Sequence, residues 1–447
     1  MTSDFLEPNS RPQRGNYAYG GIMNLKIDVR NFLAFEFLAL IAMKILSDFG
    51  VIPQAFYYVF DFINFFLIIL SLNRISSERG LGRYTLFPVL ALAVFFAVSA
   101  VINLVDPGCA FWEFFIDFRL FGVMILVCLV WDYDIWWSFI DLLYKLQWLN
   151  ALLAGFEFFA LGLIQDNIGG MFGMVAGCNG PLNVYLCLVC SYAISQYVAL
   201  GRRGKVSLVS LLLTCICSIA IAAIAEIKFF YFELVVLAIL LVLFNRPTKR
   251  TIGIVAIICA AIVIGMYIFS ILMPSQFAEM IDLDALLAEA DNSNVSTGYG
   301  VSRINAISQL DALFFHGDSM LALLGMGFGS ATPGMGSGLL VSRFYEAYGF
   351  LKYDYLQLPT LFLQVGFVGM ILYMTAVVSP VVQGFRDRKY IEPSVRWVLG
   401  LGLTFSVLFF VNCFYMSTMR TQFAFLWALA LIGPYLAQRD CSFWGRD

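Results

Sequence analysis

Charged side chains next to apolar runs are the features of this sequence that could do chemistry. The stretch "AIAEIKFFYFEL" (223–234) places Glu226, Lys228 and Glu233 beside or within apolar segments. Ionisable groups are costly to bury in such segments and often mark functional sites. A carboxylate can accept a proton, and a cation can stabilise a growing negative charge. The stretch therefore predicts a reactive cluster, with interfacial snorkelling or a structural ion pair as the alternative.

Glycine-rich runs form a second candidate site. "LLGMGFGSATPGMGSG" (323–338) contains Gly325, Gly327 and Gly329, whose backbone N–H groups could face a phosphate. The alternative is that these glycines only let the chain turn sharply against neighbouring helices. A Gly-x-Gly pattern indicates dinucleotide binding only within a βαβ unit, and no such unit precedes Gly325.

Charged residues flank these glycines on both sides. Arginine suits a bidentate grip on phosphate oxygens. The flanking candidates are Arg303, Arg343, Glu346, Lys352, Asp354 and, farther along, Arg420. Cations around a glycine loop suit a lipid-linked diphosphate, whereas a solvated loop surface is the alternative for each of them.

Metal and serine-type chemistry find little support in the sequence. His316 is the single histidine, which cannot by itself build a zinc site or a Ser-His-Asp triad. The ten cysteines lie mainly inside apolar runs without paired spacing, so no metal site and no disulfide framework is expected. Helix-to-helix pairing is the alternative to direct chemistry for five further charged residues, namely Glu36, Asp61, Asp117, Arg119 and Lys145.

The elements that position these residues are apolar helices. The 447-residue chain is 61% hydrophobic and 13% charged, roughly half the charged share of a soluble domain. Apolar runs near twenty residues predict an all-α polytopic membrane protein of about twelve transmembrane helices. The predicted helices are 31–48, 51–73, 85–104, 113–131, 136–163, 180–200, 206–225, 229–245, 251–273, 356–383, 395–413 and 421–437.

Basic loops orient these helices. Arg and Lys recur in every second connection, around 74–83, 202–205, 246–250 and 386–389, and the acidic connection after Asp132 is the exception. Because cytoplasmic loops are enriched in basic residues, both termini are predicted to be cytoplasmic. The first thirty residues show no cleavable signal pattern, so the first span is expected to act as an uncleaved signal.

The predicted organisation has five parts. A cytoplasmic segment (1–30) precedes nine transmembrane helices (31–273), and three more helices (356–437) precede a cytoplasmic tail (438–447). Between them lies one long periplasmic loop (274–355). Apolar residues at helical spacing in 277–290 and 304–315 predict that this loop folds as a cap carrying amphipathic helices and the glycine-rich segment.

In the order of these features the chain resembles the O-antigen and exopolysaccharide polymerases (Wzy-type), within the wider O-antigen polymerase and ligase superfamily. The matching stretches are "AEIK" (225–228), Arg303 before the glycines, "LLGMGFGS" (323–330) and "YLQLPTLFLQVGFVGMILY" (355–373). The resemblance covers roughly residues 170–437.

This resemblance implies a GT-C-like membrane glycosyltransferase in the bacterial inner membrane. Such an enzyme transfers a growing glycan from undecaprenyl diphosphate onto an incoming lipid-linked repeat unit, with no metal, nucleotide or other cofactor. Its partners would be the undecaprenyl-diphosphate-linked oligosaccharide, membrane lipid and, where one is present, a chain-length regulator, and no nucleic acid. The hypothesised catalytic residues are Glu226, Arg303 and Asp354, and the hypothesised diphosphate- and glycan-binding residues are Lys228, Gly325, Gly327, Gly329, Arg343, Lys352 and Arg420.

The sequence departs from these relatives in two places. Ligases of the superfamily carry a histidine before the span that follows the long loop, whereas this chain reads "FLKYDYLQ" there. Many relatives also carry an arginine before an Asn-Pro-Asn-like step, whereas "GGMFGMVAGCNGPLN" (169–183) has none, so Lys228 or another cation would have to substitute. The alternatives are an O-antigen ligase-like transferase, a lipid-linked-sugar transporter or flippase, and a structural scaffold.

Overall fold

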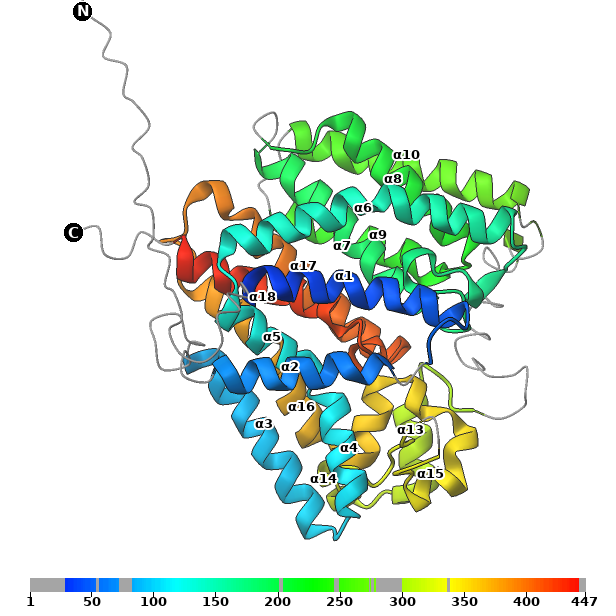
Figure 1. Ribbon diagram of the computed structural model, residues 1–447, viewed down its shortest axis with the longest axis vertical. Coiled ribbons are helices and arrows are strands. Elements are labelled where there is room, and N and C mark those ends of the chain that lie inside the picture. The colour runs from blue at the N-terminus through cyan, green and yellow to red at the C-terminus, as the bar shows by residue number, and fades with distance from the viewer. Residues whose placement is uncertain are drawn as a thin grey trace, which may run out of the picture.

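The chain folds as a bundle of α-helices, here in a computed structural model that describes residues 29–53, 56–71, 83–200, 204–244, 249–272, 274, 277–278, 300–335 and 338–441 (Figure 1). Within these residues no strand occurs. The long helices are α1 (Val29–Asp48), α2 (Tyr57–Ser71), α3 (Arg83–Ile102), α4 (Pro107–Asp117), α5 (Arg119–Val130), α6 (Tyr133–Phe159), α7 (Asn179–Leu200), α8 (Leu208–Ile224), α9 (Lys228–Phe244), α10 (Lys249–Leu272), α16 (Gln357–Arg386), α17 (Trp397–Tyr415) and α18 (Ala424–Asp440).

Several helices suit a membrane. In the described part of the chain, four segments are long and apolar enough to cross a bilayer, namely 85–102, 179–200, 357–386 and 393–415. Shorter apolar helices cover 57–70, 119–130, 208–224 and 258–271. The chain therefore has the composition and helix lengths of a helical membrane protein.

Each of the twelve predicted stretches is helical over most of its described length, but one of them is not a single helix. The stretch 113–131 is two helices, α4 and α5, separated at Phe118. Asp106 starts α4 early, because its carboxylate accepts from the N–H groups of Gly108 and Cys109 at 2.9 and 3.0 Å. Pro107 follows at the first helical position, where its missing N–H costs nothing. The Asp-Pro pair was the missed start signal.

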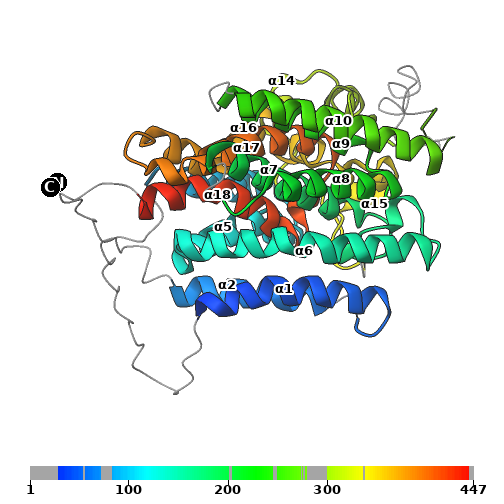
Figure 2. The same cartoon turned by 90° about the horizontal axis from the view of Figure 1, so that it is seen from above.

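The core lies where α16, α17 and α18 meet. Figure 2 shows α1 and α2 on one side of the bundle, α10 on the other, and α7, α17 and α18 between them. Every residue from Ala424 to Ala437 of α18 is buried, as expected for a helix that is apolar on all sides. A Cβ on Gly384 of α16 or Gly402 of α17 would lie 2.6 or 2.3 Å from Pro434 of α18. Glycine at these two positions therefore lets the three helices approach closely.

Residues 300–335 and 338–351 fold into a cap of short helices. These are α13 (Ala306–Leu310), η7 (Asp311–Phe315), α14 (Ser319–Leu324), α15 (Arg343–Tyr348) and η8 (Gly349–Leu351), followed by η9 (Tyr353–Tyr355) at the entrance to α16. Figure 1 shows α13, α14 and α15 near α4 and α16. The predicted helix over 304–315 is confirmed in α13 and η7, whereas 279–290 lies outside the described residues, as do 1–28 and 442–447 of the predicted terminal segments.

Candidate functional site

Cap and bundle meet at Tyr415, the last residue of α17. The Arg303 guanidinium lies over the Tyr415 ring, 4.1 Å from its centre, and Arg303 is half-buried. Tyr415 also stacks on Phe229 at 4.2 Å, with the ring planes 9° apart. Phe229 follows Lys228 at the start of α9, so Tyr415 places the Arg303 segment next to the "AEIK" turn.

The "AEIK" turn joins α8 to α9 in a strained conformation. Glu226 has φ +50°, which places a residue other than glycine in the left-handed region. The Lys228 N–H donates to the Glu226 carbonyl at 2.9 Å, and both residues are half-buried. Such strain costs of order 1–3 kcal/mol and concentrates at functional sites. The turn therefore remains a candidate site.

Arg420 is the most deeply buried of the predicted cations, with 7% of its side chain exposed. It belongs to η11 (Thr418–Arg420), in the connection between α17 and α18. Its guanidinium reaches Glu113 at 2.5 Å and Asp117 at 3.1 Å, both buried on α4. An arginine held by two carboxylates is already neutralised. Arg420 therefore anchors α4 to the α17–α18 connection, and the direct diphosphate-binding role predicted for it is not retained.

Asp354 lies beside this anchor. The Tyr345 hydroxyl donates to Asp354 Oδ2 at 3.3 Å, and Asp354 Oδ1 has no hydrogen-bond partner within the described residues. Burial raises the pKa of Asp354 above its ordinary value, although the positive charge of Arg420 and the Tyr345 hydrogen bond oppose that rise. Burial and the negative charge of Asp354 raise the pKa of Tyr345 to about 12. A carboxyl group with a raised pKa is suited to proton transfer nearer neutral pH.

Two backbone contacts hold Arg303, Asp354 and Arg420 in the same region. The N–H of Val301 donates to the carbonyl of Leu351 at 2.9 Å, which places the residues before Arg303 alongside those before Asp354. The N–H of Gln357 donates to the carbonyl of Met416 at 3.4 Å, which ties the start of α16 to the α17–α18 connection. The structure thus gathers these three predicted residues, which are far apart in the sequence.

The glycine-rich loop has a different environment from the one predicted. α16 is broken at Gly366, where φ is +60° and ψ is −166°. Its Leu363 and Gln364 carbonyls accept from the N–H groups of Met326 and Gly327, each at 2.9 Å. A helix break leaves carbonyls that must find partners, above all in an apolar surrounding. The loop therefore completes the hydrogen bonding of a broken helix.

The three predicted glycine ligands are consequently occupied. The Gly325 N–H donates to Leu321, the Gly327 N–H to Gln364, and the Gly329 N–H to the Gln364 side chain at 3.1 Å. All three glycines are buried. A Cβ on Gly325 would lie 2.4 Å from the Gln364 and Val365 backbone. The predicted role of these amides as phosphate ligands is therefore not retained, and close packing explains the glycines.

The other predicted residues lie at the surface of the cap. Arg343 is exposed at the first position of α15, after the helix-capping residue Ser342. Lys352 is half-buried with φ +53° between η8 and η9. His316 is exposed at the end of η7. Among the residues that the structure describes, no group of three potential ligands could hold a metal ion.

Several residues of the site were missed or left as minor candidates in the sequence. Gln364 donates to Glu113 at 2.6 Å and accepts from Gly329, so it links the Arg420 anchor to the glycine-rich loop. Its position inside an apolar run was a signal that could have found it. Arg119 pairs with Asp61 on α2 at 2.7 Å, in agreement with helix-to-helix pairing. Tyr415 carried no sequence signal, because its role depends on a distant arginine.

A second buried polar cluster lies one turn below the Phe229–Tyr415 stack. Glu233 of α9 accepts hydrogen bonds from Asn412 of α17, from Asn183 of α7 at 2.7 Å and from the Cys187 thiol at 3.3 Å. These partners join three helices at a fully buried carboxyl group. Glu233 thus joins α7, α9 and α17 through neutral partners, and within the described residues it forms neither of the two predicted alternatives, interfacial snorkelling or an ion pair.

Comparisons with known proteins assign no family to this chain. Neither the protein-family models nor the curated proteins match this chain.

Proposed function

We propose that the chain is a polysaccharide polymerase that transfers a growing glycan from undecaprenyl diphosphate onto an incoming lipid-linked repeat unit. One observation carries the proposal. Arg303, Asp354 and the turn with Glu226 and Lys228 converge on the α17–α18 connection beneath a folded cap. This arrangement offers cations for a diphosphate and a carboxyl group for proton transfer, at an end of apolar helices where a prenyl chain could remain in the bilayer.

The proposed reaction needs no metal or nucleotide. Asp354 accepts the proton of the acceptor hydroxyl, and the resulting oxygen forms a bond to the anomeric carbon of the growing glycan. The bond from that carbon to the diphosphate breaks, and undecaprenyl diphosphate leaves with the electron pair. Arg303 and Lys228 stabilise the charge that develops on it.

Roles within the site follow from burial and contacts. Arg303 keeps polar N–H edges for phosphate oxygens, because the Tyr415 ring contacts the face of its guanidinium. We assign the role of base to Asp354, because its buried Oδ1 has no hydrogen-bond partner in the described residues and burial raises its pKa. Glu226 then orients the acceptor. Arg343 and Lys352 extend the cationic surface toward the glycan.

The decisive experiment is polymerisation by the purified protein in lipid nanodiscs supplied with an undecaprenyl-diphosphate-linked repeat unit. Arg303→Ala and Lys228→Ala are expected to abolish long glycan chains on a gel, and Arg303→Lys to shorten them because the planar fork is lost. Lys145→Ala is the matched control, since in the described part of the chain this exposed lysine pairs with Asp141 alone, and Asp141 keeps a second partner in Lys205. Normal chain length in both alanine variants would refute the assignment.

The proposal also includes a topology. It places about twelve spans in the bacterial inner membrane in a GT-C-like arrangement, with the cap in the periplasm and both termini in the cytoplasm. Single cysteines introduced at Ser308 and Arg386, in a background without reactive thiols, test it. A membrane-impermeant maleimide is expected to label intact cells at 308 but not at 386. The opposite labelling would overturn the proposal.

One observation bears on the transporter alternative. Discontinuous helices line the substrate sites of many transporters, and α16 is discontinuous at Gly366. However, the carbonyls of Leu363 and Gln364 are taken by the glycine-rich loop and are not left for a substrate or ion. This observation favours an enzyme. A ligase would differ from a polymerase in its acceptor, so the same assay with lipid A core separates the two.

A further inference from the structure

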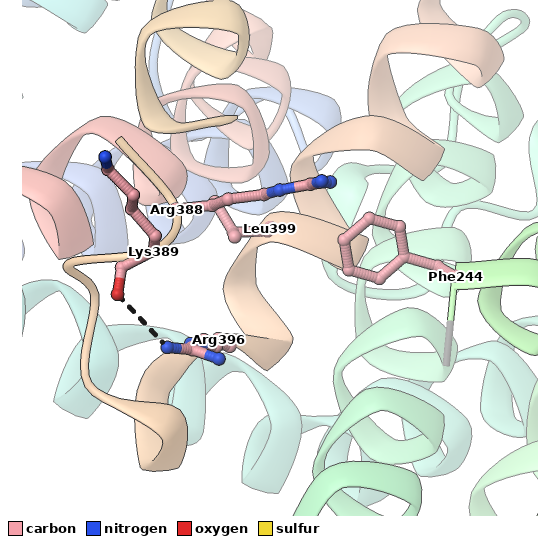
Figure 3. Close-up of a pocket in the computed structure, with 5 residues that line it drawn as sticks. All are labelled: Phe244, Arg388, Lys389, Arg396 and Leu399. Atoms are coloured by element: carbon pink, nitrogen blue, oxygen red, sulfur yellow. Dashed lines mark hydrogen bonds between the residues drawn. The ribbon is translucent and has the colours of Figure 1, made fainter. Parts of the chain in front are cut away.

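A cavity lies at the end of α17 opposite Tyr415. It has a volume of about 320 Å³ and is lined by Phe244, Arg388, Lys389, Arg396 and Leu399 (Figure 3). Phe244 is the last residue of α9, Leu399 belongs to the first turn of α17, and the three cations come from the connection between α16 and α17. Because α17 has 19 residues, the cavity is separated from the Arg303 site by about 28 Å.

Two guanidinium groups define the polar side of this cavity. Figure 3 shows Arg388 extending past Leu399 toward Phe244, whereas the ammonium group of Lys389 points away. Arg396 is fixed in place, since it donates to the carbonyl of Ile391 at 2.9 Å and to that of Lys389 at 3.4 Å. Both arginines are exposed. The connection therefore presents two guanidinium groups at the same opening, one reaching toward Phe244 and one held by two backbone carbonyls.

Neither arginine is neutralised by a carboxylate within the described residues. The two acidic residues of the connection are engaged elsewhere. Asp387 accepts from Gln438 of α18 at 3.3 Å, and Glu392 accepts from Ser394 at 2.7 Å. The residues that line the cavity thus include three cations and no carboxylate, which suits an anion, above all a phosphate group that can accept from two guanidinium forks.

The other side of the cavity is apolar. Leu399 is 2% exposed, and the Phe244 ring packs edge-on against Phe385 of α16 at 5.3 Å. Val382, one turn before Phe385, is 59% exposed, and Ile239 of α9 is 52% exposed. The apolar wall therefore continues onto helix faces that are open outside the bundle. A free phosphate would use only the arginines, whereas an amphiphile would use both sides.

We propose that this cavity binds the phosphate-bearing headgroup of an anionic membrane lipid, with its acyl chains along α9 and α16. The cavity lies where α9 and α16 end and α17 begins, which is the level of the headgroups for helices that cross a bilayer. Basic pockets between transmembrane helices recognise lipid phosphates in this way. The bound lipid would hold the α16–α17 connection against the end of α9.

Native mass spectrometry of the full-length protein, released from nanodiscs, tests this site. Phosphatidylglycerol and phosphatidylcholine of the same acyl length are the two probes. Adducts with phosphatidylglycerol are expected to exceed those with phosphatidylcholine. In Arg388→Gln/Arg396→Gln the affinity for phosphatidylglycerol should fall about thirty-fold, since each cation near a membrane contributes about a factor of five.

The control is Lys145→Gln/Arg343→Gln, which removes the same charge at two exposed positions, leaves Asp141 paired with Lys205, and is expected to retain the adducts. Arg388→Lys/Arg396→Lys distinguishes loss of charge from unfolding, because it keeps the charge and should retain most of the binding.

Equal adducts with both lipids, or unchanged binding in the glutamine variant, would overturn the proposal. Displacement of phosphatidylglycerol by millimolar inorganic phosphate would show that the ligand is a free anion, and would overturn the lipid assignment. Polymerisation is not measured, so failure here is distinguishable from failure of the proposed function.

Discussion

Gly325 and Gly366 form a contact between two backbones that no larger residue can make. Gly325 has φ +74° and ψ −176°, and Gly366 has φ +60° and ψ −166°, a region that only glycine populates readily. A Cβ on Gly325 would lie 2.4 Å from the backbone of α16, and one on Gly366 would lie 2.4 Å from Leu323 of α14. We expect Gly325→Ala and Gly366→Ala each to destabilise the protein.

The magnitude can be worked from the structure. Placing alanine in this backbone region costs about 1–3 kcal/mol. A clash with a backbone that cannot move away adds about 1–3 kcal/mol. If the loop retreats instead, the carbonyls of Leu363 and Gln364 lose their donors, at about 1–3 kcal/mol each. Either route lowers the free energy of unfolding by about 2–6 kcal/mol. Because both glycines serve one contact, the double variant should cost less than the sum.

Thermal unfolding in detergent, followed with a thiol-reactive dye, measures this effect, because most of the ten cysteines are buried. For a chain of this length, about 1 kcal/mol corresponds to roughly 1 °C, since the entropy of unfolding grows with length. Gly325→Ala should therefore unfold about 2–6 °C below the parent. Gly317→Ala is the control, because Gly317 has φ +79° and no neighbour within 4 Å of a Cβ.

The control separates backbone strain from the contact. Gly317→Ala should lower the unfolding temperature by only about 1–2 °C, the cost of left-handed backbone alone. Unfolding of Gly325→Ala within about 1 °C of the parent, or no lower than that of Gly317→Ala, would refute a contact between the two backbones. Strictly additive losses in the double variant would show that the two glycines do not share a contact.

Three further predictions concern the Arg420 region and the α17 terminus. Arg420→Ala should reduce the yield of monodisperse protein and lower the free energy of unfolding by about 3–5 kcal/mol, because it leaves Glu113 buried without its cation. Arg343→Ala removes an exposed arginine and should leave both measurements unchanged. Tyr345→Phe removes a hydrogen bond that favours ionised Asp354, so it should raise the Asp354 pKa further and move the acid limb of the pH–rate profile to higher pH. An acid limb that does not move would exclude Asp354 as the base. Tyr415→Phe should retain polymerisation, whereas Tyr415→Ala should reduce its rate about tenfold through a higher KM for the lipid-linked donor. Equal activity of the two variants would contradict a positioning role for the ring.

Local patterns in the sequence determined the helices. Apolar runs such as 180–200 and 356–383 are long enough that burial dictates helix wherever they pack, and they correspond to α7 and α16. The exception shows what such patterns omit. α4 begins at Pro107 because Asp106 caps it, and this local signal lay outside the apolar run that marked the predicted helix.

Only the tertiary structure decided which groups the candidate residues contact. The sequence predicted a phosphate-binding loop at Gly325, Gly327 and Gly329, because their spacing indicates that backbone N–H groups could face a ligand. The spacing does not show whether those N–H groups already donate to another group of the protein. The break at Gly366, forty residues away in the chain, supplies the acceptor carbonyls. Likewise Arg420 looked like a free cation until α4 brought Glu113 to it. Such pairings depend on contacts between residues distant in sequence, and the composition of a local segment does not encode them.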